Sequence, residues 1–239
     1  MSEYENKKLA VLIDADNAQA SIIKELLAEV SKYGVASIKR AYGDWTTTNL
    51  KGWKSHLHKH AIQPIQQFSY TSGKNATDSS LIIDAMDILH DSNLDGFCLV
   101  SSDSDFTRLA TRIRESGLIV IGFGEKKTPE PFVSACDKFI YTEILDPAIN
   151  VHIDSNEKIN SELIKILSEA IKATSKEDEW SSLSSVGGYI SKNTPSFDAR
   201  NYGFEKLGQL VKTLSFIDVK EKSFGNGSGN VHLYVKMKA

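Results

Sequence analysis

The sequence predicts an α/β fold, a three-layer sandwich with a mainly parallel sheet, followed by a small C-terminal winged-helix domain. From residue 9 to about residue 147, short apolar runs without a helical period alternate with amphipathic segments. This alternation is typical of strands that are buried on both faces between two layers of helices. After residue 157 the pattern changes to three amphipathic segments and then two strand-like segments.

The elements of the first part follow one another along the chain. Residues 9–13 form the first strand, and residues 20–33 form a helix that Gly34 ends. A strand at 35–41, a helix at 50–60, a strand at 61–68, a helix at 78–89, a strand at 97–100, a helix at 106–116 and a strand at 118–123 complete the set. Pro64 lacks a backbone donor, so the strand at 61–68 is expected at a sheet edge or to be irregular.

The second part is expected to hold helices at 157–173, 181–191 and 202–214, and strands at 216–222 and 231–237. The glycine-rich segment FGNGSGN joins the two strands as a hairpin loop. Three helices and a hairpin describe a winged helix. Because the segment NVHIDSN is polar, we predict a first domain at 1–149, a linker at 150–156 and a second domain at 157–239.

Composition sets limits on the class of protein. With 239 residues, of which 41% are hydrophobic, the chain is long enough for packed cores. The formal net charge of -3 excludes a broadly basic nucleic-acid binder but leaves room for local basic patches. Two cysteines suit a reducing compartment, and no apolar run approaches the ~20 residues that cross a bilayer. We therefore expect a cytoplasmic protein without a membrane partner.

Carboxylates follow two of the predicted strands. Asp14 follows the first strand in LIDADN, and Asp103 and Asp105 follow the strand at 97–100 in LVSSDSDF. Asp78 begins the helix that precedes this strand, and a right-handed crossover places the start of such a helix at the same sheet edge. Ligands bind at this edge in open α/β sheets. We expect these four acids to converge.

Four clustered carboxylates repel one another unless a cation compensates them, and their hard oxygen ligands suit Mg²⁺ or Mn²⁺. The pattern predicts a site in which Asp14, Asp103 and Asp105 are the main metal ligands. Asp78 would hold a second ion or a metal-bound water. Each acid alone is equally well explained as a helix cap or turn residue, but that explanation does not account for the set. Supporting roles at this edge are expected for Asn17, Asp16, Ser101, Ser102, Ser104 and Lys74.

Other polar residues divide into binding candidates and ordinary surface. Arg40 and Trp45 follow a strand toward the site edge and are candidates for contact with single-stranded RNA. Asp84 and Asp87 lie off the apolar stripe of their helix and are expected to be solvated. In the second domain, the cations that could touch a nucleic-acid backbone are Lys192, Arg200, Lys206 and Lys212.

Four motifs of the first part, LIDADN, RAYGDW, KNATDSSLIIDAMD and LVSSDSDF, together resemble the NYN domain of the PIN-like ribonuclease superfamily, especially its LabA-like branch. The resemblance covers residues 8–146. It implies a PIN-like fold and a metal-dependent (endo)ribonuclease. The implied acidic site falls on Asp14, Asn17, Asp78, Asp103 and Asp105. Asp16 lies between the usual positions of the family.

The second part resembles an OST-HTH/LOTUS domain through residues 180–211 and the hairpin that follows. This resemblance implies RNA binding or, in some branches, binding of a protein partner. Two other functions stay open for the whole chain. Phosphatases of the haloacid dehalogenase type also carry DxD after their first strand and use Mg²⁺, although Ala18 departs from their motif. A non-catalytic RNA-binding adaptor is the other alternative.

Overall fold

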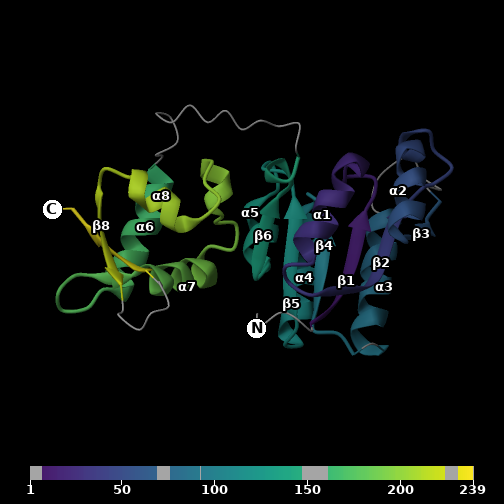
Figure 1. The fold of residues 1–239 in the computed structure, drawn as a ribbon. Coiled ribbons are helices and arrows are strands. Elements are labelled where there is room, and N and C mark those ends of the chain that lie inside the picture. Colours follow the sequence, from purple (N-terminus) through teal and green to yellow (C-terminus); the bar gives the residue numbers. More distant parts are fainter. Residues whose placement is uncertain (1–6, 69–75, 92, 147–160, 224–230, 239) are drawn as a thin grey trace. The chain divides into compact units, whose positions relative to one another are not determined.

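The computed structural model describes residues 7–68, 76–91, 93–146, 161–223 and 231–238 (Figure 1). The chain divides into two compact units, Met1–Ile149 and Asn150–Ala239, and each is described by itself. Among the described residues, no helix has both the length and the apolar character needed to cross a membrane.

The first unit is built on a six-stranded sheet in which every neighbouring pair of strands is parallel. The strand order is β3-β2-β1-β4-β5-β6. The strands are β1 (Lys8–Asp14), β2 (Val35–Gly43), β3 (Gln63–Gln66), β4 (Gly96–Val100), β5 (Ile119–Gly124) and β6 (Lys138–Tyr141). The direction of winding reverses between β1 and β4, which leaves a crevice beyond their carboxyl ends.

Helices cover both faces of this sheet, as the sequence predicts. Two helices, α1 (Ile23–Val30) and α2 (Trp53–His60), pack on one face. The other face is covered by α3 (Ala76–Asp91), α4 (Thr107–Glu115) and α5 (Glu130–Ala135) (Figure 1). Side chains of β1 alternate between the two cores: Leu9, Val11 and Ile13 face α1 and α2, whereas Ala10 and Leu12 face the opposite layer. The three-layer α/β prediction is confirmed.

Three short elements differ from the sequence-based expectation. The strand expected at 61–68 is only Gln63–Gln66, and it lies at the sheet edge that Pro64 favours. Neither α5 nor β6 was expected as an element. α5 has six residues, too few to show a helical period, and the apolar run of β6 is limited to the buried Phe139 and Ile140 between two half-buried residues. Their aromatic residues Phe132 and Phe139 are nevertheless fully buried.

The second unit combines helices with a small antiparallel sheet of order β7-β9-β8. Its elements are α6 (Ser161–Thr174), β7 (Ser181–Ser182), α7 (Leu183–Asn193), α8 (Leu207–Thr213), β8 (Ile217–Ser223) and β9 (Val231–Met237). α7 begins after Ser182 because the Ser182 hydroxyl caps it, accepting from the Ser185 amide at 3.1 Å. α8 begins at Leu207 rather than near residue 202, where a separate 3₁₀ turn, Ala199–Tyr202, ends at Gly203 in the left-handed region (φ 84°).

Candidate metal centre

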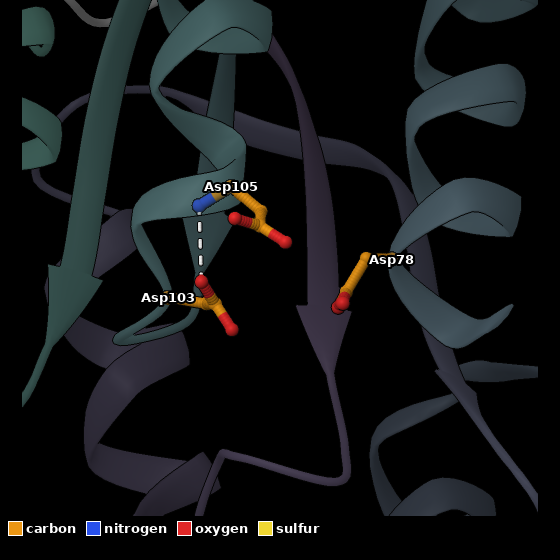
Figure 2. A group of neighbouring side chains, drawn as sticks. All are labelled: Asp78, Asp103 and Asp105. Carbon is orange, nitrogen blue, oxygen red and sulfur yellow. Dashed lines mark hydrogen bonds between the residues drawn. The ribbon is translucent and has the colours of Figure 1, made fainter. Parts of the chain in front are cut away.

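Three carboxylates from two segments meet at the carboxyl edge of the parallel sheet. Asp78 lies in the first turn of α3, and Asp103 and Asp105 lie in the segment that leaves β4. Each offers an oxygen atom, and these three atoms lie within 4.8 Å of one another. Figure 2 shows Asp78 on one side of the end of β1 and the two other carboxylates on the other side. We call these three residues the carboxylate cluster.

The segment after β4 holds its two acids in place through a helix cap. Asp103 precedes the 3₁₀ turn Ser104–Phe106, and its Oδ1 accepts a hydrogen bond from the Asp105 amide at 3.0 Å (Figure 2). Phe106 is buried and anchors the turn in the core. Asp103 can therefore cap the turn and also belong to the carboxylate cluster, because the Asp105 amide contacts only one of its two oxygens.

Asp14, the last residue of β1, lies beside the cluster and is completely buried. Its Oδ2 accepts hydrogen bonds from Asn17 Nδ2 and Ser101 Oγ, both at 2.8 Å. The same Ser101 hydroxyl accepts from the Asp103 amide at 3.1 Å and so connects Asp14 to the segment after β4. Oδ1 of Asp14 is buried and has no hydrogen-bond partner among the described residues. An orphaned carboxylate oxygen is costly in a protein interior.

Burial and like charges act together on these acids. Burial is the main cause that raises the pKa of Asp78 to about 6, and the charges of Asp14, Asp103, Asp105 and Asp16 raise it further. Burial also raises the pKa of Asp14, against the hydrogen bonds from Asn17 and Ser101. At neutral pH the site therefore concentrates negative charge that a cation would stabilise.

The raised pKa of Asp78 predicts how stability depends on pH without metal. Asp78 in the folded state binds its proton up to about pH 6, whereas the unfolded chain releases it near pH 3.8, so its contribution to stability falls as pH rises through this window. In EDTA at pH 7, Asp78→Asn removes both the cost of burying this charge and its repulsion, and should raise the melting temperature by about 2–4 °C for each kcal/mol relieved. Thermal melts at pH 4 should show a much smaller difference. Asp87→Asn, on an exposed position of α3, serves as the control. An equal effect at both pH values would contradict the assignment.

Asp16 and Ser102, two of the predicted supporting residues, form hydrogen bonds that fix the segments around the carboxylate cluster. Asp16 is exposed, and its Oδ2 accepts from Thr77 Oγ1 at 2.8 Å, so it contacts the start of α3 directly before Asp78. Ser102 Oγ accepts from the Glu125 amide at 2.8 Å, which ties the segment after β4 to the end of β5. Ser104 is exposed, and its carbonyl accepts from Thr107 Oγ1 at 2.6 Å. Lys74 lies outside the described residues.

Asp84 makes a contact that its position off the apolar stripe of α3 does not predict. Asp84 is not a solvated surface charge: its carboxylate accepts from Arg40 Nη1 and from the Tyr42 hydroxyl, which both come from β2. Arg40 is thereby held between β2 and α3. Trp45 is partly buried and donates its Nε1–H to the Ile65 carbonyl at 2.9 Å. Arg40 and Tyr42 are two residues apart and therefore lie on the same face of β2, and this spacing was the signal in the sequence that they could share a partner.

Of the four cations expected to touch RNA in the second unit, two form ion pairs with carboxylates and two are exposed. Arg200 donates from Nε and Nη2 to the two oxygens of Asp198 at 3.0 and 2.7 Å. Lys212 Nζ lies 2.6 Å from Glu221 Oε1. Lys192 and Lys206 are exposed. Arg200 and Lys212 are thus already bound to carboxylates of the same unit.

Comparison with known proteins identifies both parts of the chain. The family model for the NYN domain matches residues 8–146, and the model for the OST-HTH/LOTUS domain matches residues 154–228. No curated protein matches the chain. A crystal structure of a protein of unknown function from Vibrio parahaemolyticus is 19% identical, covering 58% of this chain and 94% of that one, with a TM-score of 0.48. A solution structure of residues 175–257 of a Chromobacterium violaceum protein is 38% identical, covering 34% of this chain and 84% of that one, with a TM-score of 0.27.

Proposed function

Because the chain belongs to the NYN domain family, we propose that it is a metal-dependent ribonuclease that hydrolyses RNA phosphodiesters. The observation that carries the proposal is the carboxylate cluster of Asp78, Asp103 and Asp105 at the crevice between β1 and β4. NYN domains are typically PIN-like nucleases, and the OST-HTH/LOTUS domain suggests that RNA is the ligand.

The residues present suit a divalent cation. The donor set consists of carboxylate oxygens, which Mg²⁺ and Mn²⁺ prefer. The buried Oδ1 of Asp14 faces no partner among the described residues, which suits an additional ligand or an ordered water. Asp78, Asp103 and Asp105 would hold the ion, with Asp14 beside them. An ion held there would lower the pKa of a bound water and offset charge on the phosphate and the leaving oxygen.

Neighbouring residues contribute by fixing the carboxylates before substrate binds. Ser101 and Asn17 donate to the same oxygen of Asp14 and so set the direction of its carboxylate. The Asp16 bond to Thr77 fixes the start of α3 and therefore the position of Asp78. Groups that orient metal ligands in this way typically change metal affinity or activity by about 10–100-fold when removed.

The geometry of Asp14 disfavours the phosphatase alternative. A phosphatase of the haloacid dehalogenase type needs its first aspartate to attack phosphorus, and Asp14 has no exposed surface. One of its oxygens also accepts two hydrogen bonds. Failure to trap a phosphoaspartate at Asp14 would agree with this reading.

The proposal is tested with purified chain and end-labelled RNA and DNA oligomers of the same sequence, in Mg²⁺, Mn²⁺ or EDTA. We expect cleavage of RNA in either metal and none in EDTA. A water that attacks in line, with no role for the 2′-hydroxyl, leaves 5′-phosphate and 3′-hydroxyl ends. A circular RNA separates the two modes of cutting, because only an endonuclease opens it. Cyclic phosphate products, or unchanged cleavage in EDTA, would contradict the proposal, and binding without turnover would favour the adaptor.

A further inference from the structure

The antiparallel sheet of the second unit has one face in the core and one face outside it. Val219 on β8 is paired with Val235 on β9, and both pack in the core of the unit. Side chains alternate along a strand, so their neighbours Lys220 and Tyr234, which are also paired, lie on the outer face. Lys222 shares this face, two residues further along β8.

Two aromatic rings and two lysines lie together on this outer face. The Nζ atom of Lys220 is 5.8 Å from the centroid of the Trp180 ring, and Nζ of Lys222 is 5.0 Å from the centroid of the Tyr234 ring. Both lysines are exposed and both rings are partly exposed. We call Trp180, Lys220, Lys222 and Tyr234 the basic aromatic face.

Neither lysine is paired with a carboxylate in the described residues, and Asp218, the acid on this face of β8, lies 3.9 Å from Lys238 Nζ. By contrast, Lys236 on the same sheet pairs with Glu179, and Lys212 on α8 pairs with Glu221. Contacts between an ammonium group and an aromatic ring at an exposed site are weak, about 0.5–1 kcal/mol, so a ligand can displace them.

Flat rings next to free ammonium groups match the chemistry of a single-stranded nucleic acid. Bases stack on aromatic side chains without regard to sequence, while lysines meet the phosphates between them. We propose that the basic aromatic face binds single-stranded RNA, with bases on Trp180 and Tyr234 and phosphates at Lys220 and Lys222. The choice of RNA as ligand rests on the function proposed above. RNA would then bind to the sheet, and not to the cations predicted from the sequence, which are Lys192, Arg200, Lys206 and Lys212.

The first test measures the affinity of the full chain for a fluorescent single-stranded RNA over a range of salt concentrations, in EDTA so that binding is separate from cleavage. Losing two phosphate contacts should lower the slope of log K against log salt by about 1.4, because each contact with a single strand contributes roughly 0.7. The variant is Lys220→Ala with Lys222→Ala. The matched control is Lys165→Ala with Lys172→Ala, which removes two exposed lysines of α6 in the same unit. The control should leave the slope unchanged.

The second test addresses stacking. Trp180→Ala should weaken binding at least about fivefold, whereas Trp180→Phe, which keeps a ring, should retain most of the affinity. Duplex RNA of the same sequence should bind more weakly, since its bases are already stacked. Thermal melts confirm that each variant is folded.

Several outcomes would overturn the proposal: wild-type affinity in both Trp180→Ala and the Lys220 and Lys222 double variant, a larger loss in the control pair, or no RNA binding at any salt concentration. The last result, with capture of an acidic protein through the same residues, would favour protein docking.

A chain that binds RNA through this face but never cleaves it would refute only the proposed function. A chain that cleaves RNA but is insensitive to these variants would refute only the proposed face.

Discussion

Asp103→Asn and Asp78→Asn are each expected to reduce the rate of RNA cleavage by more than about a hundredfold, the upper end of what is lost when only the groups around a metal ligand are changed. Each substitution keeps the shape of the side chain and removes one negative charge from the carboxylate cluster. The ion would then be bound more weakly or in a different position. Single-turnover cleavage of an end-labelled RNA at fixed Mn²⁺ measures the effect.

Two controls separate a role in the cluster from a general effect. Asp87→Asn changes an exposed acid on the same helix as Asp78 and should cleave at the wild-type rate. Far-ultraviolet circular dichroism should show that Asp78→Asn and Asp103→Asn are folded. If both cleave as fast as the wild type, the activity comes from another site or from a contaminant.

A divalent ion should also stabilise the fold strongly. Burial and, after it, repulsion from the neighbouring carboxylates raise the pKa of Asp78 in the folded state, and an ion that binds only this state offsets the repulsion. At a Mn²⁺ concentration of about 100 times the dissociation constant, the gain is about 2.7 kcal/mol, or roughly 5–10 °C in melting temperature. Thermal melts in Mn²⁺ and in EDTA measure this difference.

The stabilisation should depend on the cluster. Asp103→Asn should lose most of the shift, whereas Asp87→Asn should keep it. Na⁺ at equal ionic strength tests whether simple screening explains the gain. An unchanged melting temperature in millimolar Mn²⁺, together with no heat of binding in calorimetry, would contradict a metal centre.

The main layout of the fold and the meeting of Asp78 with Asp103 and Asp105 were predictable from the sequence. Short apolar runs located the strands, amphipathic periods located the helices, and the handedness of the crossover placed the start of α3 beside the end of β4. The six-residue α5 and the four-residue β6 were not predictable, because α5 is too short to show a helical period and β6 contains an apolar run of only two buried residues.

Side-chain contacts between elements that are distant in the sequence were also not predictable. Asp84 lies off the apolar stripe of α3, and nothing in the helix itself shows that Arg40 and Tyr42 donate to it from β2. Likewise, the sequence cannot distinguish Arg200, which pairs with Asp198, from Lys220, which has no ion pair with any residue that the structure describes, because pairing depends on where the nearest carboxylate lies in space. The burial of Asp14 and its bond to Ser101, 87 residues away, depend on the register of β1 and β4.

The central claim is that a divalent ion binds at Asp78, Asp103 and Asp105. Iron-directed cleavage tests it most directly: Fe²⁺ takes the place of Mn²⁺, ascorbate and peroxide generate radicals at the ion, and the polypeptide is cut nearby. We predict fragments that end close to residue 78 and to residues 101–105, suppressed by excess Mn²⁺ and lost in Asp103→Asn. Cuts confined to other parts of the chain, or the same cuts in Asp103→Asn, would contradict the claim.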